Sequence, residues 1–416
     1  MGRLRSFTIA SLAHATTVLD QGLSSLSSLL SVLAVARAVD ASDFGTFALG
    51  YTGLTLFLGL SRAFFGMPLS ISARDGRASL KNLYTQSMSA ACLLFIPIAG
   101  LVIAIGAFGT FLSGNAGVGW MAVAVGIATP LVMLQDIARF FAAVSGRPHV
   151  AVGSDAIWLC GMGILFFIGG ALDEVWFSVS WLGVLVSSLL AMMVCVPWRT
   201  SVRGGLAVLK PRLGLRESVA GTAFLSSGTT LIVGFLITPF FGTGAVGSLR
   251  GAGTLFGPVN TMISFLDFGV LNHVAKRPRA SDGSSLRIVT LGLVLVEIAW
   301  AAFLLLAPPE FGQLVLGETW SGTRAILPVT GIEYFFLCIT AGMTLILKAR
   351  GESRRLILNK ILSTAMILVG TAIAVGIATQ FVAIPIIIAF AAVVGSIAMA
   401  LSVRSSFRER FHAPTQ

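Results

Sequence analysis

The residues with the clearest potential for chemistry are the charged groups that lie inside long apolar segments. The sequence contains nine of them: Asp20, Arg62, Asp136, Arg139, Asp155, Arg250, Asp267, Glu297 and Glu333. Charged side chains are costly within a bilayer, so those that occur there usually face other helices or a water-filled cavity. Arginine suits an anionic ligand, because its planar guanidinium can donate two parallel hydrogen bonds to a phosphate group.

These charged groups and the polar residues beside them form two sets of candidate site residues. The candidate substrate-binding residues are Arg62, Arg139, Arg250, Asp20, Ser24 and Asn260, and the candidate ion-coupling residues are Asp136, Asp267, Glu297 and Glu333. We expect two acids and two arginines of these sets to meet near the cytoplasmic side of the first half. The alternative is that Asp20–Arg62 and Asp136–Arg139 are ion pairs that only fix helix packing, and the residue types leave both interpretations open.

The spacing of polar residues indicates which helix faces carry these groups. In the first apolar segment Asp20 and four serines recur at steps of three and four, so they share one helical face. The same spacing links Thr52, Thr55, Gly59, Arg62 and Gly66, and it links Arg250, Gly253, Gly257, Asn260, Ser264 and Asp267. A continuous polar face inside lipid should turn toward other helices or water, which predicts an internal cavity.

The composition defines the elements that must position these faces. Of the 416 residues, 56% are hydrophobic and only 11% are charged, whereas soluble domains carry roughly 25% charged residues. Apolar blocks of about 20 residues, the length that a bilayer requires, recur along the chain. We therefore expect an all-α integral membrane protein with about twelve transmembrane helices, at 11–36, 45–70, 84–112, 119–143, 151–171, 176–198, 218–241, 247–273, 286–307, 323–348, 356–378 and 381–403.

The distribution of basic residues predicts the orientation of these helices. Alternate connectors carry 23 of the 28 Lys and Arg residues, while the intervening connectors carry only Arg37 and Arg324. By the positive-inside rule, both termini should be cytoplasmic. The net charge of +11 is thus explained by topology and by contact with anionic lipid headgroups, and we expect no nucleic-acid partner.

The sequence offers little support for enzymatic activity. It contains neither a phosphate-binding glycine loop nor a protease or esterase motif. The four cysteines lie in apolar blocks without the spacing of metal ligands, and the histidines are scattered at segment ends and in the tail. We therefore expect a non-enzyme without cofactor or metal.

A weak internal repeat indicates how the helices are grouped. Residues 44–73 and 246–275 align without gaps, and each segment is rich in glycine early and leads into a basic connector. Two similar halves of six helices are typical of transporters. We expect an N-terminal lobe at 1–205 and a C-terminal lobe at 206–416, arranged around a central cavity.

Three segments resemble a known family. In 25–49 the residues Ala36, Arg37, Phe44, Gly45, Phe47 and Leu49 fit the opening pattern of the polysaccharide-biosynthesis flippases, which export O-antigen and capsule repeat units. The segment 244–262 is similar to a second pattern of that family, with Gly247, Arg250, Ala252, Leu255 and Pro258 in place. The segment 326–355 resembles the family's tenth span and its basic loop.

The resemblance implies both a fold and an activity. The flippases belong to the multidrug/oligosaccharidyl-lipid/polysaccharide exporter superfamily, in which two six-helix lobes alternate access to a cavity. The implied substrate is a polyprenyl-pyrophosphate-linked oligosaccharide in the cytoplasmic membrane, with Arg62 and Arg250 as cavity arginines and with polysaccharide polymerase and glycosyltransferases as possible partners. Two alternatives stay open: an ion-coupled multidrug exporter of the same superfamily, and a non-transporting membrane scaffold for glycan enzymes.

Overall fold

A computed structural model describes most of the chain, and its regular structure is helical. The described residues are 22–72, 77–113, 116–199, 201–209, 220–221, 224–263, 283–349, 352–377 and 380–412, and within these ranges no strand occurs. Ten of the described helices are long and apolar enough to cross a membrane, and Gly22–Ala38 is a shorter apolar helix. Each of the twelve expected spans overlaps a described helix, so the prediction of an all-α membrane protein is confirmed.

The chain divides into two compact units, Met1–Gly228 and Thr229–Gln416. The boundary lies within a helical segment formed by η3 (Phe224–Gly228) and α10 (Thr229–Phe241). The expected lobe boundary between residues 205 and 206 stays a prediction. The two units are described separately below.

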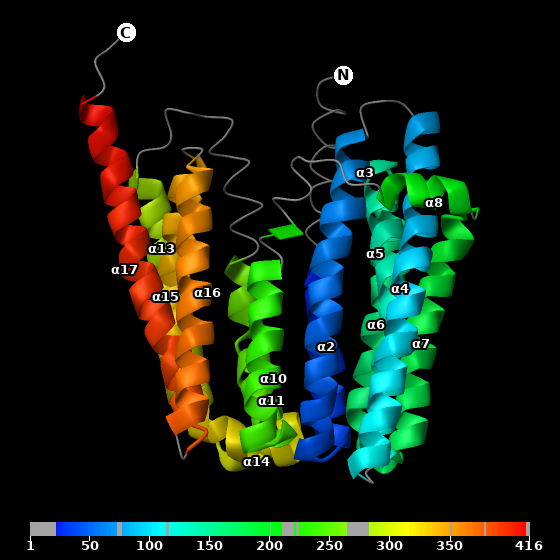
Figure 1. Cartoon of the computed structure of the whole chain (residues 1–416), viewed down its shortest axis with the longest axis horizontal. Coiled ribbons are helices and arrows are strands. Elements are labelled where there is room, and N and C mark those ends of the chain that lie inside the picture. The colour runs from blue at the N-terminus through cyan, green and yellow to red at the C-terminus, as the bar shows by residue number, and fades with distance from the viewer. Residues whose placement is uncertain are drawn as a thin grey trace, which may run out of the picture. The chain divides into compact units, whose positions relative to one another are not determined.

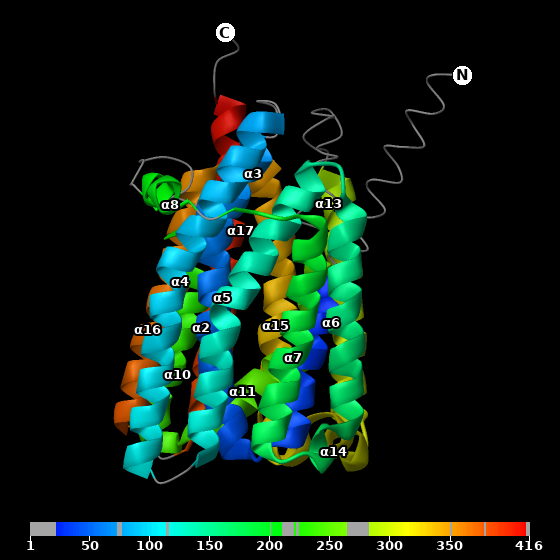
Figure 2. The same cartoon turned by 90° about the vertical axis from the view of Figure 1, so that its right-hand side faces the viewer.

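The first unit contains the helix Gly22–Ala38 and the elements α2 to α8 (Figure 1). Their bounds are α2 (Ala41–Ser61), η1 (Arg62–Gly66), α3 (Met67–Ser72), α4 (Arg77–Ser113), α5 (Ala116–Val144), α6 (Pro148–Ile168), η2 (Gly169–Ala171), α7 (Glu174–Cys195) and α8 (Val202–Leu209). The long helix α5 packs against α2, α4, α6 and α7. The short helix α8 packs on α4 and lies crosswise to the long helices (Figure 2).

Local sequence signals set several ends of these helices. Asp40 caps α2 by accepting a hydrogen bond from the backbone N–H of Asp43 at 2.8 Å, and Asp173 caps α7 in the same way through Trp176. After α5 the chain turns at Gly146, whose φ of 79° suits glycine, and Pro148 begins α6. These signals place the connectors between spans where the apolar blocks predicted them.

The second unit contains α10, α11 (Thr243–Leu255), α13 (Gly283–Leu306), α14 (Pro309–Leu316), η5 (Gly317–Thr319), α15 (Trp320–Ala349), α16 (Ser353–Ile377) and α17 (Ala383–His412). The helix α15 packs against α11, α13, α16 and α17. It therefore has the role in this unit that α5 has in the first, and both are the fourth span of their half. After α11 a break occurs at Phe256, and a further helical segment runs from 257 to 263.

Large apolar side chains lie on the outside of both units, where a soluble protein would carry charges. The exposed fraction is 83% for Phe111 and 82% for Val194 in the first unit, and 84% for Leu306 in the second. Such exposure is favourable only against lipid. The protein is therefore a multi-pass membrane protein.

Candidate functional site

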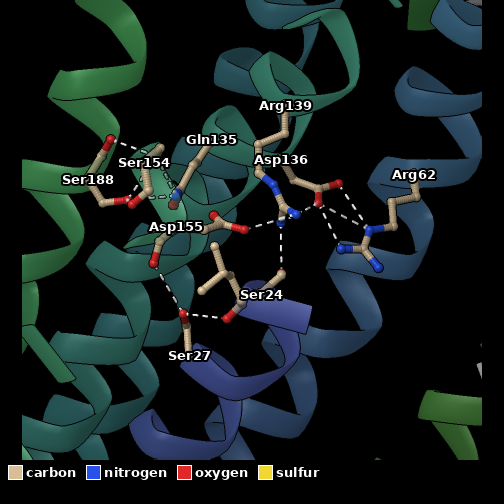
Figure 3. A network of polar contacts seen from close by, with 10 residues as sticks. Ser24, Ser27, Arg62, Gln135, Asp136, Arg139, Ser154, Asp155 and Ser188 are labelled. Carbon is tan, nitrogen blue, oxygen red and sulfur yellow. Dashed lines mark hydrogen bonds and ion pairs between the residues drawn. The ribbon is translucent and has the colours of Figure 1, made fainter. Parts of the chain in front are cut away.

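A network of polar side chains crosses the interior of the first unit, where apolar residues would be expected. It is formed by residues of the helix Gly22–Ala38 and of η1, α5, α6 and α7, with Arg62 at one end and Ser188 at the other (Figure 3). The central helix α5 contributes three members, Gln135, Asp136 and Arg139, because its neighbours surround it. The network thus joins five segments that are distant in sequence.

Arg62 and Asp136 form the outer ion pair of this network. Arg62 Nη2 donates to Asp136 Oδ1 at 2.8 Å, and Arg62 Nε lies 3.2 Å from Oδ1 and 3.1 Å from Oδ2. The Asp136 side chain is 6% exposed, whereas the Arg62 side chain is 43% exposed. Among the residues that the structure describes, no side chain or carbonyl bonds to Arg62 Nη1. This guanidinium therefore holds its carboxylate with one side and keeps the other side accessible.

Arg139 and Asp155 form the inner ion pair, which is more deeply buried. Arg139 Nη2 lies 3.0 Å from Asp155 Oδ2, and the side chains are 12% and 1% exposed. Arg139 Nη1 donates to Ser24 Oγ at 2.8 Å. The same nitrogen lies 4.0 Å from Asp136 Oδ1, so the two ion pairs are in electrostatic contact. Two arginines and two aspartates therefore alternate along the network, and their charges balance.

Hydroxyl and amide groups extend the network beyond Asp155. Ser154 and Ser188 exchange hydrogen bonds, each hydroxyl donating to the other residue's carbonyl at 2.9 and 2.8 Å. Gln135 Nε2 donates to both hydroxyls, at 3.0 and 2.7 Å. Ser27 Oγ lies 3.3 Å from the carbonyl of Asp155. These contacts hold α5, α6 and α7 together and fix the position of Asp155.

The backbone around Arg62 departs from a regular α-helix. The segment η1 is a π-helical turn, in which the N–H of Met67 donates to the carbonyl of Arg62, five residues earlier. Such turns are rare and are found frequently at functional sites. The turn ends at Gly66, where an added Cβ would lie 2.8 Å from the ring of Phe140 on α5. Glycine is thus required for the close packing of this turn on the helix that carries Asp136.

The network contains some of the predicted site residues and adds others. It brings together Ser24, Arg62, Arg139 and Asp136. The sequence predicted the proximity of the last three, together with Asp20, and did not predict the contact of Ser24 with Arg139. Asp20 and Asp267 lie outside the described residues. Asp155 was recognised as an intramembrane charge, but its role as the partner of Arg139 was missed, and so were the roles of Gln135, Ser154 and Ser188. Among the described residues, Asp136 pairs most closely with Arg62, and Arg139 pairs most closely with Asp155, rather than with each other as the packing alternative expected.

The other candidates lie in the second unit. Asn260 Nδ2 donates to Tyr334 Oη at 2.8 Å, and Tyr334 Oη donates to the carbonyl of Gly253 at 3.4 Å, so these bonds span the helix break at Phe256. Arg250 lies near enough to Tyr334 to interact with it electrostatically. Glu297 is 1% exposed, and Glu333 is half-buried.

Metal chemistry has little support in the described part of the chain. No group of three or more histidine, cysteine, aspartate or glutamate residues there is arranged to hold a metal ion. The site instead offers paired charges, one accessible guanidinium and many hydroxyls. Chemically this arrangement suits reversible binding of a polar ligand.

Comparison with known proteins indicates the fold. No family model matches the sequence, and no curated protein matches it. The structure is similar to a multidrug resistance MATE family transporter of the MOP superfamily in its inward-facing conformation (TM-score 0.70, 16% identity, 94% of this chain and 96% of that chain). It is also similar to the lipid II flippase MurJ in an inward closed conformation (TM-score 0.72, 12% identity, 94% and 87% of the chains).

A third similar structure is a MOP superfamily transporter from Pyrococcus furiosus, whose description notes a binding pocket of reversed polarity (TM-score 0.58, 15% identity, 95% and 96% of the chains). These identities are low, so the comparisons establish the fold and not the substrate. The chain has the fold of MOP superfamily transporters over nearly its whole length.

Proposed function

We propose that the protein is a flippase that moves a polyprenyl-pyrophosphate-linked oligosaccharide across the cytoplasmic membrane by alternating access. The fold supports transport, and the similarity to a lipid II flippase structure is compatible with a lipid-linked substrate. The more specific substrate class rests on the resemblance of three sequence segments to repeat-unit flippases and on the chemistry of Arg62.

The observation that carries this proposal is that the Arg62 guanidinium is paired with Asp136 and is still accessible. Its Nε and Nη2 atoms hold Asp136, and its side chain is 43% exposed although the pair lies within an apolar helix bundle. The remaining edge can donate parallel hydrogen bonds to two oxygens of a pyrophosphate, a geometry that arginine favours. Because Asp136 already orients the guanidinium, little rotamer freedom is lost when the ligand binds.

The rest of the network would complete recognition of the polar head. Hydroxyl groups such as that of Ser24 can bond to sugar hydroxyls, while the polyprenyl tail stays in the bilayer. Arg139 would stabilise negative charge at longer range. Arg250 and Asn260 stay candidate substrate-binding residues of the second unit. We place both termini in the cytoplasm, so that the head enters from the side where lipid-linked glycans are assembled.

The first test is genetic and uses Arg62→Lys. Lysine keeps the positive charge and loses the planar fork. A deletion strain should accumulate lipid-linked glycan on the cytoplasmic face, and wild-type protein should relieve this accumulation. Loss of a charge-assisted hydrogen bond costs about 1.5–3 kcal/mol, so Arg62→Lys should slow export roughly 10- to 100-fold at equal protein level. Arg199→Lys, at an exposed arginine outside the network, is the matched control and should export normally.

Two outcomes would contradict the proposal. A deletion strain without accumulated glycan would exclude this transport activity. Accumulation that Arg62→Lys relieves as fast as the wild type would remove Arg62 from the substrate path.

An ion-coupled multidrug exporter is the second candidate. It is favoured by the buried carboxylates Asp136 and Asp155, which suit cationic drugs, and by the similarity to a multidrug transporter structure. The two candidates differ in their response to substitution. An exporter of cationic drugs should lose resistance with Asp136→Asn and keep it with Arg62→Lys, whereas the flippase should show the larger defect with Arg62→Lys.

A further inference from the structure

Glu297 lies in a position of α13 that the helix otherwise fills with apolar residues. The face of α13 that turns inward includes Leu293, Glu297 and Leu304, which are 3%, 1% and 2% exposed. The opposite face is exposed and consists of large apolar side chains, among them Leu291, Leu295 and Ile298. Glu297 is therefore buried inside the second unit rather than placed at a lipid or water boundary.

Two close contacts define what lies opposite Glu297. Gly342 of α15 packs against Thr290 of α13, and Gly331 packs against Ala301. The two helices are thus antiparallel, and Glu297 lies between these contacts, across from the middle of α15. Cys338 is the titratable residue that interacts with Glu297 there, and its side chain is fully buried.

Among the residues that the structure describes, no cation forms an ion pair with Glu297. The other titratable groups on this part of α15 are Glu333 and Tyr334, and Arg250 of α11 interacts with Tyr334. Within the described residues, the Oε1 atom of Glu297 is buried without a hydrogen-bond partner. An ionised carboxylate is very unfavourable in such surroundings, whereas a neutral carboxylic acid is tolerated.

Glu297 is also close to the helix break in the second unit. One turn further along α13, Trp300 Nε1 donates to the carbonyl of Leu255 at 2.9 Å. That carbonyl belongs to the last residue of α11, immediately before the break at Phe256. A movement of the end of α11 would therefore act on α13 one turn from Glu297.

We propose that Glu297 is a proton-binding site, which holds a proton in the conformation described and exchanges it when the second unit changes conformation. The proton sits on the carboxyl group and leaves to water when the inward face of α13 becomes hydrated. The carboxylate formed then takes up a proton before the face is buried again. Binding of the proton does not depend on the substrate, but its coupling to transport rests on the proposed function.

The first experiment detects the proton directly. Infrared spectra of the purified protein in detergent should show the carbonyl-stretch band of a protonated carboxylic acid, shifted by exchange into D₂O. Glu297→Gln is nearly isosteric and neutral, so the fold should persist while the band is lost. Glu318→Gln, at an exposed glutamate of the same unit, is the matched control and should keep the band. If Glu297→Gln does not fold, Glu297→Met removes the same group from an apolar site.

The second experiment tests coupling in proteoliposomes. Transport of a fluorescent polyprenyl-pyrophosphate glycan by the wild type should change at least several-fold when a pH gradient is imposed, and Glu297→Gln should abolish this response without abolishing binding. A band that persists in Glu297→Gln, or that disappears from the wild type on adding sodium, would overturn the proton site. A lost band with an unchanged response to the gradient would overturn the coupling. A third result is that the wild type shows the band and Glu297→Gln lacks it, while neither protein transports the glycan. That result would refute the proposed function and leave the proton site in place.

Discussion

The two ion pairs of the first unit should differ sharply in their contribution to stability, because they differ in burial. Asp155→Asn removes a carboxylate that is 1% exposed and lies 3.0 Å from Arg139. The nearest carboxylate to Arg139 that remains in the described residues is Asp136, at 4.0 Å. Removing one partner of a buried pair costs about 3–5 kcal/mol. For a unit of roughly 200 residues this corresponds to a fall in melting temperature of about 6–20 °C.

Asp136→Asn is the matched comparison, since it makes the same chemical change on a neighbouring helix. Its partner Arg62 is 43% exposed, so water can solvate the guanidinium when the carboxylate is lost. The cost should be about 1 kcal/mol, or roughly 2–4 °C. Thermal unfolding of the purified variants in one detergent measures both values under the same conditions.

A double variant separates charge balance from other effects of substitution. The double variant Arg139→Gln/Asp155→Asn removes both charges of the inner ion pair. The loss of Asp155 then no longer leaves a buried arginine without this partner. The double variant should recover about 1–3 kcal/mol relative to the sum of the single variants. If Asp136→Asn and Asp155→Asn lowered the melting temperature equally, or if the double variant were as unstable as that sum, the argument from burial would be refuted.

Two packing predictions use the same assay. Gly106→Ala should destabilise the protein by about 1–3 kcal/mol, since its Cβ would lie 2.1 Å from that of Ala122, whereas Gly100→Ala, with nothing within 4 Å, should be neutral or slightly stabilising. An equal effect at both glycines would contradict the close contact of α4 with α5. Trp300→Phe should cost about 1 kcal/mol, because it removes the hydrogen bond to Leu255, and an unchanged melting temperature would show that this bond does not stabilise the helix break.

The fold was predictable from the sequence because a membrane imposes one simple requirement. Every span must be an apolar segment of about 20 residues that satisfies its own backbone hydrogen bonds. The segment expected at 119–143 therefore coincides closely with α5, and the one at 323–348 with α15. The break at Phe256 is different. The sequence predicted one continuous span at 247–273 there. The contacts that span the break come from Tyr334, and Trp300 bonds to Leu255 just before it; both residues are far away in sequence.

The site was only partly predictable, since helical spacing orders residues along one helix and gives no information on which helix faces which. Thus Arg62, Asp136 and Arg139 were identified singly, but the partner of each arginine was not. The spacing also assumed 3.6 residues per turn, whereas the π-helical turn that begins at Arg62 bonds residues five apart. Asp155 was identified as an intramembrane charge, and its adjacency to Ser154 was the signal that could have marked it as a member of the network, because it places two polar groups where a membrane helix tolerates few.

The arrangement of charges explains why Arg62, rather than Arg139, is the better candidate for contact with a ligand. Both arginines have an acidic partner, so neither needs a ligand for neutrality. Arg139 is 12% exposed and also bonds to Ser24, and a ligand could reach it only by disrupting the helix contacts around it. Arg62 is 43% exposed and is oriented by Asp136, so an anion can bind without breaking the pair. An anion bound there would add negative charge beside a balanced network, and Arg139, which lies 4.0 Å from Asp136 on its other side, would help to offset it.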